Sequence, residues 1–376
     1  MKKLLVFHSA LAPYRVDFFN MLGKSFDSFV VFLSRNNRNQ HFNMDDLLNK
    51  VKFKYGYLDK KIVIKDRDFN FGYLSYISEK EPDIIIGGEY GLPTLLPYFY
   101  KIIFNKKYKI YTICDDSLDI AEKCNGIRKI LRNFLVSKID GIIVLSDEVA
   151  DWYSDKFNLK NKPIVFPLIR NEESYRAELE QSLPLSKKYI EKYNLQGKMV
   201  FLFVGRLDTV KNLKLLIQAF DKIANDNDIL LLVGEGSQKA ELQLMANKLG
   251  KKEQIIFCGR YENLELIAWY NLADCFVLPS IYEPFGAVVN EALAAGCPVV
   301  CSKYAGASTL ISENNGILFD PKKEGDLEKA LIDFKNKNTL IPDKENVKQN
   351  LMNISFQEYI SQFTHQILKN DYNYSF

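Results

Sequence analysis

Residues 275–301 read CFVLPSIYEPFGAVVNEALAAGCPVVC, and this stretch carries the pattern from which the rest of the fold follows. It opens with a short apolar run at Cys275–Leu278, which is typical of a strand buried on both faces. A polar loop comes next, then a helix-period segment that stops at Gly296. A second apolar run, Pro298–Cys301, follows at once. Strand, helix and strand in this order predict a right-handed unit of two parallel strands.

The same alternation extends through the chain. The other expected strands are Leu4–Phe7, Phe29–Leu33, Asp83–Ile86, Ile110–Ile113, Ile142–Leu145, Val200–Val204, Ile229–Val233 and Ile255–Phe257. Ten strands are too many for one sheet of this kind, and a polar stretch between Pro167 and Gly197 interrupts the pattern. We therefore expect an α/β protein of two doubly wound, Rossmann-like domains, the first over residues 1–175 and the second over residues 185–350.

The end of the chain departs from this rhythm, because no strand follows its last helical segment. The apolar residues of residues 354–376 include Phe356, Tyr359, Ile360, Phe363 and Ile367, and this spacing predicts an amphipathic helix. The pattern alone leaves open whether that helix caps the second domain or crosses back to the first.

Composition excludes several classes of function. The 376 residues include 50 Lys and Arg against 47 Asp and Glu, and a net charge of +3 gives no support to a general nucleic-acid binder. The six cysteines form no C-x-x-C pair, so we expect neither a zinc site nor a disulfide framework. No apolar run is long enough for a signal peptide or a spanning helix. We expect a cytoplasmic protein that at most lies on a membrane.

Ligands of open parallel sheets bind beyond the carboxyl ends of the strands, so unusual residues there mark a candidate site. The expected strand Val200–Val204 runs into Gly205-Arg206, and Lys211 follows five residues later. Two cations near a helix start favour an anion such as a diphosphate. Ordinary surface cations beside a turn would give the same sequence pattern. Gly234, after the next strand, is a weaker signal for a close approach of a nucleotide.

The loop after Cys275–Leu278 offers a second set of groups. Glu283 precedes a helix and Glu291 lies about two turns into it, while the first amides of that helix, near Gly286, are unpaired donors. Two carboxylates roughly 10 Å apart with an anion site between them would suit a sugar, a diphosphate and a ribose. Alternatively, Glu283 stabilises the helix dipole and Glu291 is an ordinary helix glutamate.

Several motifs recur together, in this order, in one known family. They are Gly205-Arg206-Leu207 with Lys211-Asn212, Val233-Gly234-Glu235-Gly236, Phe257-Cys258-Gly259, Asp274–Ser280, Glu283-Pro284-Phe285-Gly286 with Glu291, Ala295–Val300, and Gly316–Phe319. Over residues 200–320 the set resembles the retaining, nucleotide-sugar-dependent glycosyltransferases of family 4. Their GT-B fold has two facing Rossmann-like domains with a cleft between them. The first domain resembles the family only in its rhythm and in Ala12–Arg15, which lacks the glycine pair that many members carry.

The resemblance implies roles for these residues. Arg206 and Lys211 would bind the donor diphosphate, Glu283 the hydroxyls of the transferred sugar, and Glu291 the ribose. The implied donor-binding residues are Gly205, Arg206, Lys211, Gly234, Glu283, Phe285, Gly286, Ala287, Val288 and Glu291. The donor would be a UDP-, GDP-, dTDP- or ADP-sugar. The family's terminal helix returns to the first domain, so we expect residues 354–376 to do the same.

The first domain should supply the acceptor side. Many members of the family carry a histidine after its fourth strand, but the corresponding run Tyr111–Asp116 has none. Asp115 is the expected catalytic substitute, with Asp116 as the alternative. By the strand-end rule, the expected acceptor-side residues are His8, Tyr14, Arg15 and Glu89. His8 would equally suit a satisfied histidine at a strand end.

No metal or other cofactor is expected. Asp66-Arg67-Asp68 and Asp226-Asn227-Asp228 have the D-x-D form of a metal site, but both fall in polar stretches, and the second precedes its strand. We interpret both as solvated turns and predict metal-independent transfer.

Residues Lys123–Lys138 hint at a membrane. They include Lys123, Arg128, Lys129, Arg132 and Lys138 with no acid, interleaved with apolar residues. This pattern is typical of a basic amphipathic helix on an anionic surface. A sheet-covering helix with a solvated basic face would look similar.

Together these features predict a retaining, metal-independent transferase. It would move a hexose-type sugar to a glycan or lipid-linked acceptor in capsule, O-antigen or exopolysaccharide biosynthesis. The alternatives are a non-catalytic nucleotide-sugar-binding subunit and a nucleotide-sugar epimerase of the same fold. The sequence does not distinguish between donor bases, sugars, acceptors or oligomeric states.

Overall fold

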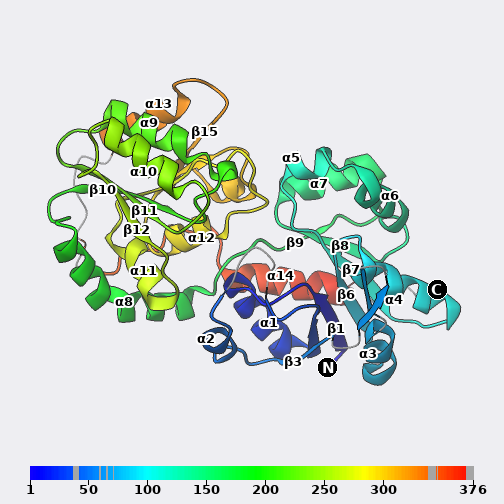
Figure 1. Cartoon of the computed structure of the whole chain (residues 1–376). Coiled ribbons are helices and arrows are strands. Elements are labelled where there is room, and N and C mark those ends of the chain that lie inside the picture. Colours follow the sequence, from blue (N-terminus) through cyan, green and yellow to red (C-terminus); the bar gives the residue numbers. More distant parts are fainter. Residues whose placement is uncertain are drawn as a thin grey trace. The chain divides into compact units, whose positions relative to one another are not determined.

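The computed structural model describes residues 1–36, 42–58, 61–64, 67–70, 72–337, 344 and 346–369, and gives only the backbone at 61–64 and 67–70. The chain divides into two compact units (Figure 1). Unit 1 is Met1–Leu168 together with the chain from Gln357 onward, and unit 2 is Ile169–Phe356. Each unit is built on its own parallel sheet.

The sheet of unit 1 has seven strands in the order β3-β2-β1-β6-β7-β8-β9, and every neighbouring pair is parallel. Its strands are β1 (Lys3–His8), β2 (Asp27–Phe32), β3 (Lys54–Tyr57), β6 (Ile84–Gly88), β7 (Lys109–Ile113), β8 (Gly141–Val144) and β9 (Ile164–Val165). The central strands are almost wholly buried, as continuous apolar runs in a doubly wound sheet should be.

Helices connect these strands and cover the sheet of unit 1 (Figure 1). They are α1 (Pro13–Ser25), α2 (Met44–Leu48), α3 (Gly72–Lys80), α4 (Leu92–Ile103), α5 (Leu118–Glu122), α6 (Gly126–Leu135) and α7 (Asp147–Phe157). Strands β6, β7 and β8 are adjacent and consecutive, so right-handed crossovers place α4 and α6 on the same face of the sheet.

The sheet of unit 2 has six parallel strands in the order β12-β11-β10-β13-β14-β15. They are β10 (Met199–Val204), β11 (Asp228–Val233), β12 (Ile255–Gly259), β13 (Cys275–Leu278), β14 (Val299–Ser302) and β15 (Gly316–Phe319). Its helices are α8 (Glu172–Lys192), α9 (Leu213–Ile223), α10 (Lys239–Lys248), α11 (Asn263–Leu272), α12 (Ala287–Ala294) and α13 (Asp326–Lys337), with the 3-10 turns η1 (Thr209–Lys211) and η2 (Gly306–Leu310).

The two doubly wound sheets confirm the predicted fold class, and every strand expected from an apolar run is present. The sequence pattern missed three short edge strands, β3, β9 and β15, and the hairpin of β4 (Lys61–Ile64) and β5 (Arg67–Asn70). Strand β3 has the sequence KYGY and β9 has only two residues, so neither offers the continuous apolar run by which the central strands were recognised. Strand β15 does contain such a run, Ile317–Phe319, which the pattern did not assign to a strand.

The polar stretch expected to join the domains is a helix. Residues 172–192 form α8, with Pro184 inside it, and Asn271 of α11 donates its side-chain amide to the Leu179 carbonyl (3.0 Å). Unit 2 therefore begins at Ile169, ahead of the expected boundary.

The final helix, α14 (Phe356–Lys369), packs against unit 1 from Gln357 onward. The buried ring of Phe363 lies 5.4 Å from the ring of Phe18 on α1 and 5.6 Å from that of Phe166. Of the two placements that the spacing left open, the structure has the one on the first domain.

Candidate functional site

Each sheet has one point where the strand order reverses, and in unit 2 this point lies between β10 and β13. The two strands are paired in parallel, yet the chain leaves β10 toward β11 on one side and leaves β13 toward β14 on the other. Loops that diverge in this way open a crevice at the carboxyl ends of the strands, which is where doubly wound sheets bind ligands.

Backbone pairing brings the two loops at this point together. The Ile281 amide, on the loop after β13, donates to the Val210 carbonyl on the loop after β10 (3.0 Å). As a result the Lys211 ammonium forms an ion pair with the Glu283 carboxylate, and both side chains are nearly covered, with 15% and 11% of their surfaces exposed. The Ser280 hydroxyl lies 3.4 Å from the same carboxylate. The sequence predicted both charged residues at the site but not their pairing.

The loop that carries Glu283 is anchored to the chain after β14. The Gly306 amide donates to the Glu283 carbonyl (3.3 Å), and the Ala307 amide donates to the Phe285 carbonyl (2.7 Å). The Phe285 side chain is buried below the loop. Gly286 then takes a positive φ of 93°, from which α12 begins at Ala287. Glycine suits this left-handed conformation because it has no Cβ to clash.

The start of α12 therefore lies in the same loop as the Lys211–Glu283 pair. The first amides of a helix, here at Ala287 and Val288, have no partner within the helix and carry partial positive charge. Amides at a helix start and a lysine ammonium are both groups that favour a phosphate.

Two further predicted residues flank this group. The guanidinium of Arg206 is 44% exposed and pairs with Asp208 (2.6 Å) on its own loop. The carboxylate of Glu291 accepts a hydrogen bond from the Tyr270 hydroxyl (2.9 Å), and burial, reinforced by this carboxylate, raises the pKa of Tyr270 well above its usual range. The structure thus orients Glu291 and leaves Arg206 at the surface.

The glycines after β10 and β11 have a packing role. A Cβ on Gly234 would lie 1.8 Å from the Gly205 carbonyl oxygen, and the φ of Gly234 is +146°. The Gly205 amide donates to the Val233 carbonyl (3.0 Å), so the backbones stay paired beyond the strands. This close approach accounts for glycine at 234 without a ligand.

In unit 1 the strand order reverses between β1 and β6. Two of the expected acceptor-side residues, His8 and Glu89, lie at the ends of these strands, and Arg15 lies close to His8. His8 ends β1, where its Nδ1 lies 3.0 Å from the Ala10 carbonyl oxygen. Since a carbonyl only accepts, Nδ1 carries the proton and Nε2 is left as an acceptor. Burial, reinforced by Arg15, lowers the pKa of His8 to about 4, so the ring is neutral at physiological pH.

Arg15 and Asp115 form an ion pair beside His8. The Arg15 side chain is 1% exposed, whereas Asp115 keeps 34% of its side chain exposed after β7. Tyr14, the neighbour of Arg15 on the first turn of α1, is half-buried.

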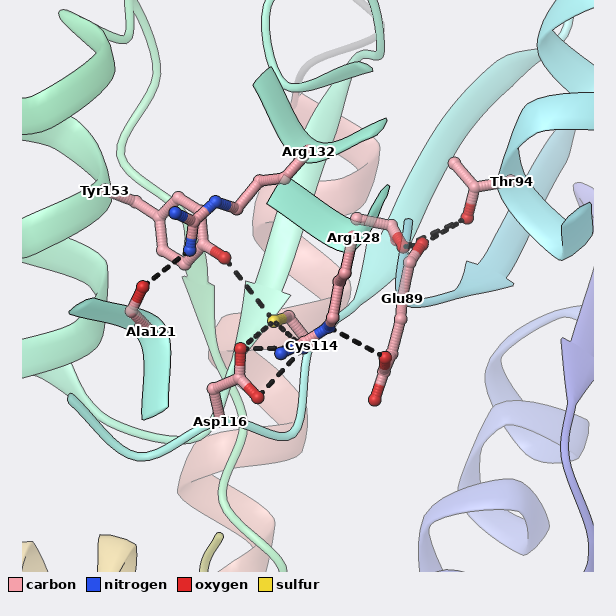
Figure 2. Close-up of polar contacts among 9 residues, drawn as sticks. Glu89, Thr94, Cys114, Asp116, Ala121, Arg128, Arg132 and Tyr153 are labelled. Carbon is pink, nitrogen blue, oxygen red and sulfur yellow. Dashed lines mark hydrogen bonds and ion pairs between the residues drawn. The ribbon is translucent and has the colours of Figure 1, made fainter. Parts of the chain in front are cut away.

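Glu89 follows β6 in a left-handed conformation, with a φ of 51°, which is rare for a residue other than glycine. Figure 2 shows its carbonyl oxygen accepting a hydrogen bond from the Thr94 hydroxyl (2.7 Å). The Thr112 hydroxyl donates to the same oxygen. Its carboxylate lies 3.2 Å from Nε of Arg128. Burial raises the pKa of Glu89, and the charge of Arg128 opposes that rise.

Arg128 was expected on the basic outer face of the segment Lys123–Lys138, but it lies beside Glu89. Its Nη2 lies 2.8 and 2.9 Å from the two oxygens of Asp116, whose side chain is 6% exposed (Figure 2). The thiol of Cys114 lies 3.2 Å from the same carboxylate. Asp116 is thus fully engaged, whereas Asp115 is partly exposed.

The basic face expected of Lys123–Lys138 needs a correction. Arg128 turns toward Glu89 and Asp116, and Arg132 is buried, donates to the Ala121 carbonyl (2.6 Å) and lies over the Trp152 ring. The spacing of Arg128, Arg132 and the buried Leu135 is i, i+4, i+7, so these residues share one inward face. That periodicity was a signal that the count of charges overlooked.

No cluster of three His, Cys, Asp or Glu residues that could hold a metal occurs among the described residues. Asp228 does not lie in the solvated turn that was expected: its side chain is buried and pairs with Lys335 (2.5 Å) at the start of β11. It therefore lies at the opposite end of that strand from Gly234. The side chains of Asp66-Arg67-Asp68 lie outside the described part of the chain.

Residues 186–351, most of unit 2, match the family of glycosyl transferases group 1. An uncharacterized glycosyltransferase of Methanocaldococcus jannaschii is 42% identical over 127 residues, which cover 33% of this chain and 32% of that protein. An N-acetylgalactosaminyltransferase of Campylobacter jejuni, named for a diphospho-undecaprenol-linked substrate, is 32% identical over 248 residues, or 64% of this chain and 63% of its own. The chain thus spans about a third of the M. jannaschii relative and under two thirds of the other.

Crystal structures of HepE from Anabaena resemble the whole chain. The complex with UDP superimposes with a TM-score of 0.75 at 17% identity, and covers 98% of this chain and 99% of its own. The complex with UDP-glucose superimposes with a TM-score of 0.73 at 18% identity, with 98% and 100% covered. At this identity the likeness establishes the GT-B fold.

Proposed function

Because unit 2 carries a glycosyl transferases group 1 domain within a GT-B fold, we propose that the protein transfers a sugar from a nucleotide diphosphate sugar to an acceptor hydroxyl. In this proposal unit 2 holds the donor and unit 1 contributes acceptor contacts. The proposal further specifies a hexose-type sugar, retention of configuration at the anomeric carbon, and a glycan or lipid-linked acceptor.

The observation that carries the proposal is the Lys211–Glu283 pair beside the start of α12. It lies where the strand order of unit 2 reverses, the usual ligand position of this architecture. A cation and an acid held together there suit the junction of a diphosphate and a sugar. The diphosphate takes the ammonium and the helix amides, and the sugar hydroxyls donate to the carboxylate.

The chemistry assigned to these groups follows from the charge that develops in the reaction. As the bond between the anomeric carbon and the diphosphate breaks, negative charge grows on the leaving group and the sugar becomes oxocarbenium-like. Lys211, Arg206 and the α12 amides stabilise that charge, and Lys211 is already held in place by its pair with Glu283. One preorganised donor of this kind typically contributes about 3–4 kcal/mol.

The remaining donor contacts are assigned by their place in the loops. Glu291, oriented by Tyr270, accepts from the ribose hydroxyls. The backbone at Gly205, Gly234 and Phe285 shapes the floor of the site. Gly205 and Gly234 are hydrogen-bonded to neighbouring strand ends, and the Phe285 carbonyl accepts from the Ala307 amide in η2, which supports this assignment.

On the acceptor side we assign the leading role to Asp115. It is the exposed member of the Arg15–Asp115 pair, while Asp116 is occupied by Arg128. His8 and Glu89 belong to the same group of strand ends, since the charges of Asp115 and Arg15 act on His8 and that of Asp115 acts on Glu89. An acid at this place suits an acceptor hydroxyl or the positive charge of the sugar.

The biological setting we propose is surface polysaccharide assembly on the cytoplasmic face of a membrane. The C. jejuni relative is named for a substrate on diphospho-undecaprenol, which supports a lipid-linked acceptor. No helix of the described residues is long and apolar enough to cross a membrane. Contact with the bilayer would therefore be peripheral, through the segment Lys123–Lys138.

The proposal is tested first by binding. In a thermal-shift panel with UDP-, GDP-, dTDP- and ADP-sugars, one nucleotide should raise the melting temperature. At 100 times its dissociation constant, the donor would add about 2.7 kcal/mol to the free energy of unfolding. No shift with any of the four would contradict the proposal.

Product analysis with that donor then identifies the reaction. We expect nucleoside diphosphate release that depends on an acceptor, and a product whose anomeric configuration by NMR matches that of the donor. Conversion of the sugar without an acceptor would identify an epimerase. Donor binding with no turnover on any acceptor would identify a non-catalytic subunit.

A further inference from the structure

Unit 1 exposes large apolar side chains on two neighbouring helices. On α4, Phe99, Ile102 and Ile103 are 42%, 57% and 70% exposed, and Phe104 directly after the helix is 57% exposed. On α6, Ile127 and Ile130 are 76% and 67% exposed. Side chains of this size are costly to leave in water, so such a concentration marks an interaction surface.

The two rows form one surface. Ile127, Ile130 and Phe134 follow i, i+3, i+7 spacing and so lie along one side of α6. The Phe134 ring stacks on the Phe99 ring of α4, with their centroids 6.2 Å apart. Figure 1 shows α4 and α6 on the same side of unit 1. We call this surface, made by Phe99, Ile102, Ile103, Ile127, Ile130 and Phe134, the α4–α6 face.

The two segments that carry the α4–α6 face are basic in sequence. Residues 92–109 contain four lysines and no acid, and residues 123–138 contain five Lys or Arg and no acid, in a chain whose net charge is only +3. Arg128 and Arg132 turn inward, and Asp140 and Asp119 neutralise Lys101 and Lys123. Four cations stay exposed at the rim: Lys106, Lys107, Lys129 and Lys138.

We propose that the α4–α6 face docks on the headgroup and upper acyl region of an anionic phospholipid bilayer. This inference rests on the proposed function, which includes a lipid-linked acceptor, and it adds the surface that would contact the membrane. The helical Ile and Phe side chains protrude from the surface, so a soft acyl layer can accept them. The ring of lysines matches anionic headgroups, and each lysine near such a surface adds to binding. A protein partner would have to supply acids at every edge.

The test is co-sedimentation of the full chain with vesicles, without donor or acceptor. Wild type should bind vesicles containing about 30% phosphatidylglycerol at least tenfold better than pure phosphatidylcholine vesicles. The apolar variant I102S/I127S/I130S and the charge variant K106E/K107E/K129E should each bind the anionic vesicles at least tenfold more weakly. All six positions are partly or fully exposed, so both variants should fold.

A matched control comes from exposed apolar residues of unit 2. L244S/I332S removes side chains that are 55% and 45% exposed on α10 and α13, and it should bind vesicles as wild type does. Equal binding by wild type to neutral and anionic vesicles, or wild-type binding by the two α4–α6 variants, would overturn the proposal. So would a concentration-dependent dimer, lost in I102S/I127S/I130S, with no vesicle binding.

The same variants separate this proposal from the proposed function. Neither set of changes touches the donor site, so the nucleotide-induced thermal shift should stay unchanged in both. Vesicle binding without any nucleotide shift would contradict the proposed function and leave the docking surface standing. The reverse result would contradict the docking surface alone.

Discussion

Lys211 and Glu283 lie 72 residues apart in sequence and are each other's nearest charged partner at the end of the unit 2 sheet. Both are largely shielded from water, and a paired charge in that position is held in one orientation. A diphosphate that binds there meets an ammonium that is already in place. The stabilisation it gains is available in the transition state at no cost of reorganisation.

Replacement of Lys211 by alanine should therefore lower turnover by about 10²-fold or more, since one preorganised donor to the leaving group is lost. The measurement is kcat with the donor identified by thermal shift, beside a circular dichroism spectrum to check folding. Lys214→Ala is the control, because Lys214 is 47% exposed and pairs with Glu241 rather than with a residue of the donor site. Equal turnover in both variants would remove Lys211 from the mechanism.

His8 shows what burial does to a single titratable group. Its ring packs against Phe19 and Phe32, with centroids 5.3 and 6.4 Å away, beside the buried cation of Arg15. The protonated form is disfavoured there, so the pKa falls from 6.5 to about 4. Between pH 6.5 and pH 4, His8 is therefore protonated in the unfolded chain and neutral in the folded chain.

Acidification from pH 7 to pH 4.5 should therefore cost the wild-type protein more stability than it costs His8→Gln. The extra loss begins near pH 6.5, is complete near pH 4, and amounts to at most about 3 kcal/mol. Urea unfolding of both proteins at the two pH values measures it, because other titrating groups cancel in the comparison. An equal loss in both proteins would show that His8 is not held neutral.

At the scale of elements, glycines let the ends of β10 and β11 stay in contact. Gly234→Ala should destabilise unit 2 by about 1–3 kcal/mol more than Gly250→Ala does. Both glycines have positive φ, but a Cβ at 234 meets the Gly205 carbonyl, whereas a Cβ at 250 meets nothing within 4 Å. Denaturant midpoints of the two variants give the difference. Similar midpoints would mean that the strand ends separate easily.

The terminal helix tests a second element. Phe363→Ala should lower the free energy of unfolding by about 3–5 kcal/mol, because its buried ring packs on Phe18 and Phe166. Gln362→Ala, one residue earlier on the exposed side of α14, should change it by less than about 0.5 kcal/mol. A mild effect of Phe363→Ala would indicate that α14 is only loosely attached to unit 1.

Some of these elements could be predicted from the sequence and others could not. The buried strands were predicted correctly because continuous apolar runs such as Ile229–Val233 are strong signals. Pro184 and the charged residues around it suggested a linker, but packing against α11 keeps α8 helical. The spacing of Arg128 and Arg132 on α6 was a signal that both face inward. It could not show that Arg128 pairs with Asp116 and Glu89, because these acids lie in other segments of the chain.

The whole molecule has two sheets, and each is assigned one part of the proposed reaction. Each brings its candidate residues to the point where its strand order reverses, and this rule let the sequence propose Arg206, Lys211 and Glu283 together. It could not foresee which groups pair. The ion pairs Lys211–Glu283 and Arg15–Asp115 join residues from distant loops, and their contacts depend on backbone hydrogen bonds that no local pattern encodes.

Protein groups are assigned to stabilise the leaving-group charge, so we expect the reaction not to need a metal ion. Lys211, Arg206 and the α12 amides are assigned the work that a divalent cation could otherwise do. Transfer should therefore keep its rate within about twofold when EDTA is added and when Mg²⁺ is restored. The assay is nucleoside diphosphate release by the purified protein. Loss with EDTA and recovery with Mg²⁺ would contradict metal-independent transfer.

The most direct measurement is a crystal structure of the protein with the nucleoside diphosphate that the thermal-shift panel selects. We predict that a phosphate oxygen lies within hydrogen-bond distance of the Lys211 ammonium and of the Ala287 or Val288 amide, with the ribose near Glu291. A nucleotide bound elsewhere, with Lys211 and Glu283 still paired and untouched, would contradict the account.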